Sequence, residues 1–143
     1  MIGDSWTHKI ARICILPFVN TSVSPNHITL VRLITGLIAC AAFALKINIL
    51  GGIFWLISTF LDRADGELAR VSGKTTEWGH KFDYYSDTFI TALFFISIGI
   101  NLHGELPNYW SIIMGICAAL GVIFTEIYAE IIDQKKQAAG EKA

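Results

Sequence analysis

Four long apolar stretches alternate with short polar links along the chain. The first runs from Ile28 to Leu45 after the breaker Ser24–Asn26, and the fourth runs from Leu106 to Thr125. Both are close to the length of about 20 mostly apolar residues that a membrane-spanning helix needs. The second, near 47–70, and the third, 79–102, reach that length only if their charged ends belong to the same helices. The pattern predicts an all-α, polytopic transmembrane helical bundle with four spans.

The composition agrees with a membrane protein. Hydrophobic residues make up 53% of the 143 residues, charged residues only 16%, and the mean hydropathy is +0.52. Soluble domains usually carry about 25% charged residues. The net charge of -1 and the lack of a basic tract argue against a nucleic-acid partner. Cys14, Cys40 and Cys117 form no CxxC pair, so neither a zinc site nor a disulfide framework is indicated.

The first residues predict a helix that lies on the membrane surface. Trp6, Ile10 and Ile13 recur at helical spacing, with charged residues elsewhere on the helical wheel. A frayed terminus is the alternative. The chain therefore divides into an amphipathic juxtamembrane segment at 1–23, a transmembrane domain at 24–134 and a polar tail at 135–143.

Lysine and arginine positions predict the orientation. Lys9 and Arg12 precede the first span, and further basic residues occupy the link 70–81 and the tail. The other two links carry only Lys46. By the positive-inside rule, both termini and the link 70–81 face the cytoplasm. The acidic residues next to this link then lie at the cytoplasmic surface.

Two pairs of aspartates flank the link between the second and third stretches. Asp62 and Asp65 are three residues apart, and Asp83 and Asp87 are four apart, so each pair shares one helix face. A carboxylate costs about 2.5–3.5 kcal/mol at the bilayer centre, and converging carboxylates also repel one another. Divalent cations remove both costs, and oxygen-only ligands suit Mg²⁺ or Mn²⁺. The alternative is that the carboxylates cap helices and pair with nearby basic residues, which are Arg63, Arg70 and Lys81.

Neighbouring residues fit a phosphate-containing ligand. Small residues beside the carboxylates would leave open space, namely Gly66, Ala69, Gly73 and Gly79. Arg70 and Lys74 could complement phosphate charge. Arg32, inside the first apolar stretch, could bind phosphate, extend its charge toward the membrane surface or pair with an aspartate. Glu67 is expected to be solvated.

Eight positions together form the pattern D-x-x-D-G-x-x-A-R-x8-G-x-x-x-D-x-x-x-D without a departure. They are Asp62, Asp65, Gly66, Ala69, Arg70, Gly79, Asp83 and Asp87. This pattern resembles the signature of the class I CDP-alcohol phosphatidyltransferases. The segment SPNHIT at 24–29 is similar to the family's entry into its first transmembrane helix.

The resemblance implies an enzyme that joins an alcohol to the phosphate of a CDP-linked substrate and releases CMP. Two ions, Mg²⁺ or Mn²⁺, would be held by Asp62, Asp65 and Asp83 and by Asp62, Asp83 and Asp87. Asp87 would also be the general base for the acceptor hydroxyl. The CDP-alcohol site would comprise Asn26, His27, Ile28, Thr29, Gly66, Ala69, Arg70, Thr76 and Gly79. Partners would be a CDP-linked lipid or alcohol, an acceptor alcohol, membrane lipids and, by the same resemblance, a second copy of the chain.

One departure and three rival functions stay open. Family members typically have six transmembrane helices, so this chain is expected to be a fragment, a short variant, or a subunit whose missing walls come from another chain. An inactive fragment would keep the metal site without turnover. A cation-binding membrane protein would use the same carboxylates, although Arg70 and the small residues suit a phosphate better. Membrane prenyltransferases also bind diphosphates through aspartates, but their acidic motifs are spaced differently.

Overall fold

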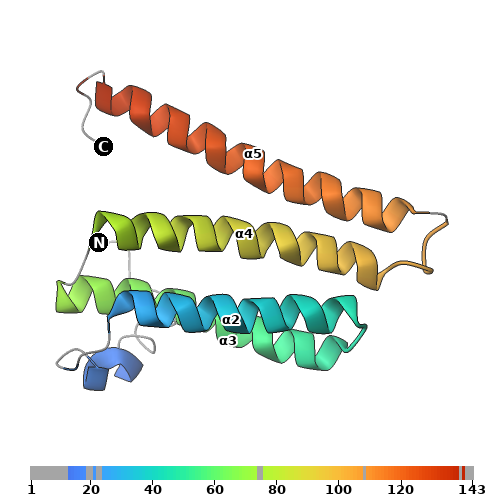
Figure 1. The fold of residues 1–143 in the computed structure, drawn as a ribbon, viewed down its shortest axis with the longest axis horizontal. Coiled ribbons are helices and arrows are strands. Elements are labelled where there is room, and N and C mark those ends of the chain that lie inside the picture. Colours follow the sequence, from blue (N-terminus) through green and yellow to red (C-terminus); the bar gives the residue numbers. More distant parts are fainter. Residues whose placement is uncertain are drawn as a thin grey trace.

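The computed structural model describes residues 13–18, 21, 24–73, 76–107, 109–138 and 140. Within them the chain forms one short 3-10 turn and four long α-helices (Figure 1). These are η1 (Leu16–Phe18), α2 (Pro25–Ala44), α3 (Asn48–Ser72), α4 (Glu77–Asn101) and α5 (Trp110–Ala138). No strand forms among the described residues, so the all-α prediction is confirmed.

Successive helices run in opposite directions (Figure 1). The first turns of α2 and α4 therefore lie at the same end of the molecule as the last turns of α3 and α5. Helices α3 and α4 have 25 residues each, which corresponds to about 37 Å at roughly 1.5 Å per residue. Both include the predicted acidic ends, so charged and apolar parts belong to the same helices. We call the end that carries the aspartates the acidic end.

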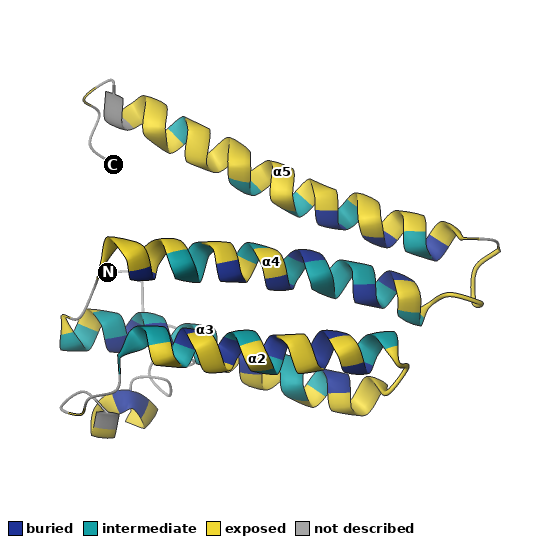
Figure 2. Ribbon diagram, viewed as in Figure 1, coloured by how far each residue is buried: buried dark blue, intermediate teal, exposed yellow. Residues whose placement is uncertain are grey.

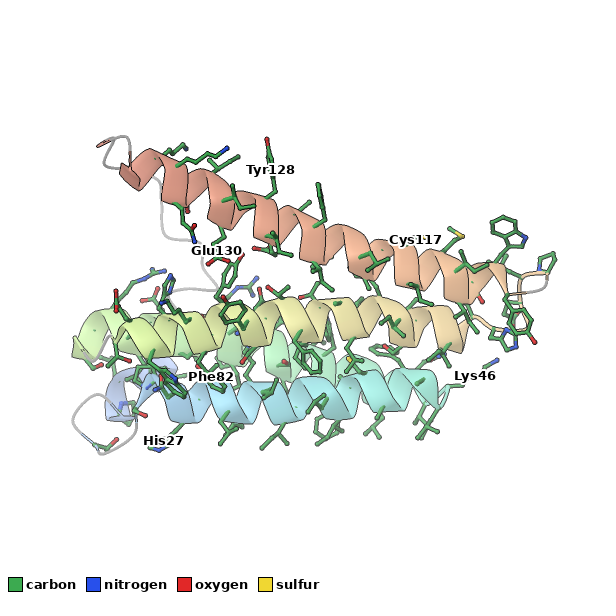
Figure 3. All side chains as sticks on the ribbon, turned by 45° about the horizontal axis from the view of Figure 1, so that its top comes forward. His27, Lys46, Phe82, Cys117, Tyr128 and Glu130 are labelled. Carbon is green, nitrogen blue, oxygen red and sulfur yellow. The ribbon has the colours of Figure 1, made fainter. Side chains whose placement is uncertain are left out.

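Within the described part of the chain, two helices are long and apolar enough to cross a membrane by length and composition, α2 and the Trp110–Lys136 part of α5. Exposed residues cover most of α5 (Figure 2). Cys117 and Tyr128 point away from the other helices (Figure 3). Large apolar side chains such as Ile49 and Leu56 are also exposed on α3. Such a surface suits lipid, and the count of four spans stays a prediction.

Helix α2 packs against both α3 and α4, and α5 packs against α4. Gly36 explains the close approach of α2 to its two neighbours. A Cβ atom there would lie 2.9 Å from Ile90 of α4 and 3.1 Å from the Ser58 hydroxyl of α3. The Ser58 hydroxyl donates a hydrogen bond to the Arg32 carbonyl at 3.1 Å. Small residues at helix interfaces are what allows membrane helices to pack closely.

At the acidic end, local interactions explain where α2 and α4 begin and where α3 stops. Ser24 precedes α2, and its backbone N–H donates to Nδ1 of His27 at 3.2 Å. Gly73 ends α3 in the left-handed region with φ 65°, which glycine adopts without strain. Thr76 precedes α4, where its hydroxyl accepts a hydrogen bond from the Gly79 N–H at 3.0 Å.

The terminal segments are described only in part. The predicted amphipathic helix at 1–23 lies largely outside the described residues. Ile15 is buried against Ala64 and Leu68, so this part of the segment packs on α3. Helix α5 continues to Ala138, so the predicted tail at 135–143 begins inside a helix.

Candidate active site

Three of the predicted metal ligands lie together at the acidic end. Asp62, Asp65 and Asp83 each offer a carboxylate oxygen, and these oxygens are within 4.8 Å of one another. Asp65 is only 3% exposed, whereas the Asp62 side chain is about half exposed. Like charges this close repel one another unless a cation lies between them. Oxygen donors from carboxylates are what Mg²⁺ and Mn²⁺ prefer, so the donor set fits such an ion.

Arg32 of α2 connects the fourth aspartate to this cluster. Its Nη1 lies 3.0 Å from Oδ1 of Asp62 and 2.7 Å from Oδ1 of Asp83. Its Nη2 forms an ion pair with Oδ1 of Asp87. Arg32 is 4% exposed, so its charge is buried among these carboxylates. Of the three roles left open for Arg32, the structure shows pairing with aspartates, and it involves three of them rather than one.

Thr29 forms a hydrogen bond with the remaining aspartate, Asp65. Its hydroxyl donates a hydrogen bond to Oδ2 of Asp65 at 2.8 Å, and both side chains are buried. Thr29 is also one of the residues predicted to bind the CDP-alcohol. Its position additionally orients a carboxylate of the predicted metal site.

A cavity of about 140 Å³ opens beside the cluster, between the acidic ends of α2, α3 and α4. It is lined by Pro25, Asn26, Thr29, Asp65, Gly66, Ala69, Thr76, Gly79, His80 and Asp83. Most of the predicted CDP-alcohol residues are therefore brought together. Pro25 and His80 were not predicted. His80 is three residues before Asp83, and this helical spacing is the signal that could have identified it.

The two glycines of the cavity wall have different roles. A Cβ atom on Gly66 would meet no atom of the described residues within 4 Å, so the predicted open space is confirmed there. A Cβ atom on Gly79 would lie 2.6 Å from Oδ1 of Asn26 and 2.9 Å from the Thr76 hydroxyl. The prediction of open space is therefore wrong at Gly79, because Asn26 and Thr76 fill it, whereas Gly66 leaves room inside the cavity.

Three predicted substrate residues lie outside the cavity wall. His27 is exposed at the first turn of α2 (Figure 3), and Ile28 packs against the apolar cluster around Leu68. Arg70 has a side chain that is 69% exposed, and it pairs with Glu67 at 3.0 Å. The expectation that Glu67 is solvated is wrong, because its neighbours bury it to 8% exposure. Substrate roles for His27, Ile28 and Arg70 stay predictions.

Comparison with protein families matches residues 22–143 to the family described as CDP-alcohol phosphatidyltransferase. The chain belongs to this family. The match covers all eight signature positions and every helix from α2 onward. Family membership and the two apolar helices together identify a membrane protein.

Named relatives share the matched region. The chain is 37% identical to an archaetidylinositol phosphate synthase of Pyrococcus horikoshii over 79 residues, 54% of this chain and 42% of that protein. It is 30% identical to a bifunctional IPC transferase and DIPP synthase of Aquifex aeolicus over 106 residues, 74% of this chain and 24% of that protein. A protein of the same name from Archaeoglobus fulgidus is 35% identical over 78 residues, 54% of this chain and 16% of that protein. The chain thus matches less than half the length of these relatives.

The hydrogen bond between Thr29 and Asp65 generates a stability prediction. Thr29→Val keeps the side-chain shape but leaves a buried carboxylate oxygen without its donor, which costs about 1–3 kcal/mol. Thermal or denaturant unfolding of the detergent-solubilised protein should show this loss.

The matched control is Thr35→Val in the same helix. The hydrogen bonds of the Thr35 hydroxyl go to carbonyls of its own helix, those of Val31 and Arg32. Its effect should stay within about 0.5 kcal/mol. Equal effects of the two changes would contradict the assigned role of Thr29.

Proposed function

We propose that the chain is an integral-membrane transferase that moves a substituted phosphate group from a CDP-alcohol to an acceptor alcohol. CDP-diacylglycerol is one such donor. The acceptor oxygen forms a bond to the phosphorus that carries the alcohol, the P–O bond to CMP breaks, and CMP leaves with the bonding electron pair. The observation that carries the proposal is the cavity, whose lining includes the signature residues Asp65, Gly66, Ala69, Gly79 and Asp83.

Four aspartates have distinct tasks in this proposal. Asp62, Asp65 and Asp83 would hold one divalent ion, and Asp62, Asp83 and Asp87 a second. Such ions, Mg²⁺ or Mn²⁺, would supply positive charge to the diphosphate and the departing CMP. Asp87 accepts the proton of the acceptor hydroxyl, for which it must come within hydrogen-bond reach of that group. Thr29 keeps Asp65 oriented toward the cluster.

The CDP-alcohol would occupy the cavity with its diphosphate next to Gly66, where the backbone of α3 is accessible. Asn26 and Thr76, at the first turns of α2 and α4, supply polar groups for the nucleotide. Ala69 and Gly79 limit the side-chain volume around it. His27, Ile28 and the exposed Arg70 would contribute at the open side as the substrate enters.

The proposal includes a topology of four spans with the acidic end in the cytoplasm. Support comes from basic residues at that end, Arg70 in the last turn of α3 and Lys135 and Lys136 in the last turn of α5. Lys46 follows α2 at the opposite end. This asymmetry matches the positive-inside rule. A homodimer, which the family resemblance suggests, belongs to the same proposal.

The direct test measures CMP release from CDP-diacylglycerol with a panel of acceptor alcohols, with Mg²⁺ or Mn²⁺ and with chelator. Release should require metal and fall by at least about 100-fold in Asp87→Asn, because the general base is lost. Asp133→Asn, an exposed aspartate of α5, is the matched control and should retain activity.

The outcomes separate the rival functions. Metal-dependent binding of CDP-diacylglycerol with no release for any alcohol would identify a fragment that binds without turnover. Metal binding with no affinity for the nucleotide lipid would contradict the transferase and favour a cation-binding protein.

A second prediction concerns the open space at Gly66. Gly66→Ala adds a methyl group that meets no protein atom but extends into the cavity. Binding of CDP-diacylglycerol should weaken roughly tenfold or more, since a methyl group overfills the site. The free energy of unfolding should be unchanged or rise by up to about 1 kcal/mol from helix propensity.

The control is Gly52→Ala, which is also in α3 and also has no close neighbour among the described residues. It should leave the binding of CDP-diacylglycerol unchanged. Unchanged binding in Gly66→Ala would place the nucleotide lipid elsewhere.

A further inference from the structure

Arg32 pairs with three of the four aspartates of the acidic cluster, and Asp65 has a different partner. In the described residues, the ion pairs of Asp62, Asp83 and Asp87 all come from this one guanidinium. Asp65 instead accepts a hydrogen bond from Thr29. The three carboxylates around Arg32 are the same three that the proposed function assigns to the second metal ion.

A guanidinium and a metal ion cannot use these oxygens together. Arginine stays protonated in proteins, so its positive charge cannot be removed by a proton transfer. Its Nη1 lies 2.7 Å from Asp83 and 3.0 Å from Asp62, whereas Mg²⁺ binds its oxygen ligands at about 2.0–2.1 Å. The two cations would compete for the same lone pairs and repel each other at this distance.

The side chain is held where this competition occurs. Arg32 is buried, and the carbonyl of the same residue accepts the hydrogen bond from Ser58 of α3. One turn further along α2, Gly36 brings the helix against Ser58 and Ile90. The guanidinium is therefore placed between an aspartate of α3 and two aspartates of α4.

We propose that Arg32 is a positioning residue that sets the order in which two divalent ions bind. The first ion binds at Asp62, Asp65 and Asp83, where Arg32 contacts two of the three ligands, and the second binds more weakly because Arg32 contacts all three of Asp62, Asp83 and Asp87 and must be displaced. This inference rests on the proposed function and deepens it. Four carboxylates and two divalent ions sum to zero formal charge, and Arg32 adds one positive charge. The loaded cluster thus favours an anionic diphosphate.

The test titrates Mn²⁺ into the chelator-treated, detergent-solubilised full chain and measures free Mn²⁺ by electron paramagnetic resonance. The wild type should bind one ion tightly and a second at least about tenfold more weakly, because a buried like charge opposes the second. Arg32→Gln removes that charge, so the second affinity should rise by at least about tenfold and the first should rise by a smaller factor. If Arg32 only maintained the fold, both affinities would fall together, and that result would overturn the inference.

Two further variants keep the result decisive. Arg32→Lys retains the charge, but one ammonium cannot bridge three carboxylates as a guanidinium does. Its second affinity should lie between those of wild type and Arg32→Gln, and a value at or below wild type would overturn the inference even if Arg32→Gln does not fold. Arg63→Gln removes an arginine next to Asp62 in sequence, and should change both affinities alike by less than about threefold.

Failure of the inference can be told apart from failure of the proposed function. A wild type that binds no Mn²⁺ would contradict the metal site itself. A wild type that binds two ions, with Arg32→Gln unchanged at the second, would overturn only the role of Arg32.

Discussion

The acidic end depends on one buried positive charge among converging negative charges. Asp62 from α3 and Asp83 and Asp87 from α4 approach because the Arg32 guanidinium contacts all three. Removing this guanidinium would leave three neighbouring negative charges without their shared partner. Gly36 and Ser58 set the position of α2 that makes this contact geometrically possible. Helix α2 is thus the central element of the bundle, although it carries none of the aspartates.

At the acidic end, the polar cavity lies next to the apolar parts of the helices. Apolar halves of the helices suit lipid, and the helix ends at Ser24, Gly73 and Thr76 stop the helices around the cavity. A CDP-linked lipid has the matching division into an apolar tail and a charged diphosphate. A site at the boundary between the two environments can bind both parts without burying the diphosphate in hydrocarbon, where an unpaired charge is costly.

The sequence predicts the helices and the aspartate clustering well, because spacings of three and four residues define a helix face without tertiary information. The triple contact of Arg32 could not be predicted, since it depends on the rotation of α2 about its axis relative to α3 and α4. Glu67 was predicted to be solvated because it is charged and outside the signature, but packing buries it beside Arg70. His27 is predicted to contact the CDP-alcohol, and its Nδ1 also accepts a hydrogen bond from the Ser24 N–H before α2. The Arg32 contacts come from long-range packing, which a linear pattern does not encode.

The central claim is that four aspartates and the cavity beside them form a two-metal site. Anomalous diffraction from crystals grown with Mn²⁺ and CDP-diacylglycerol tests it most directly. We expect two anomalous peaks about 3.5–4 Å apart, one contacting Asp62, Asp65 and Asp83 and the other contacting Asp62, Asp83 and Asp87. Density for the diphosphate should lie beside Gly66. Absence of any peak within coordination distance of Asp62 and Asp83, with Mn²⁺ bound elsewhere, would contradict the account.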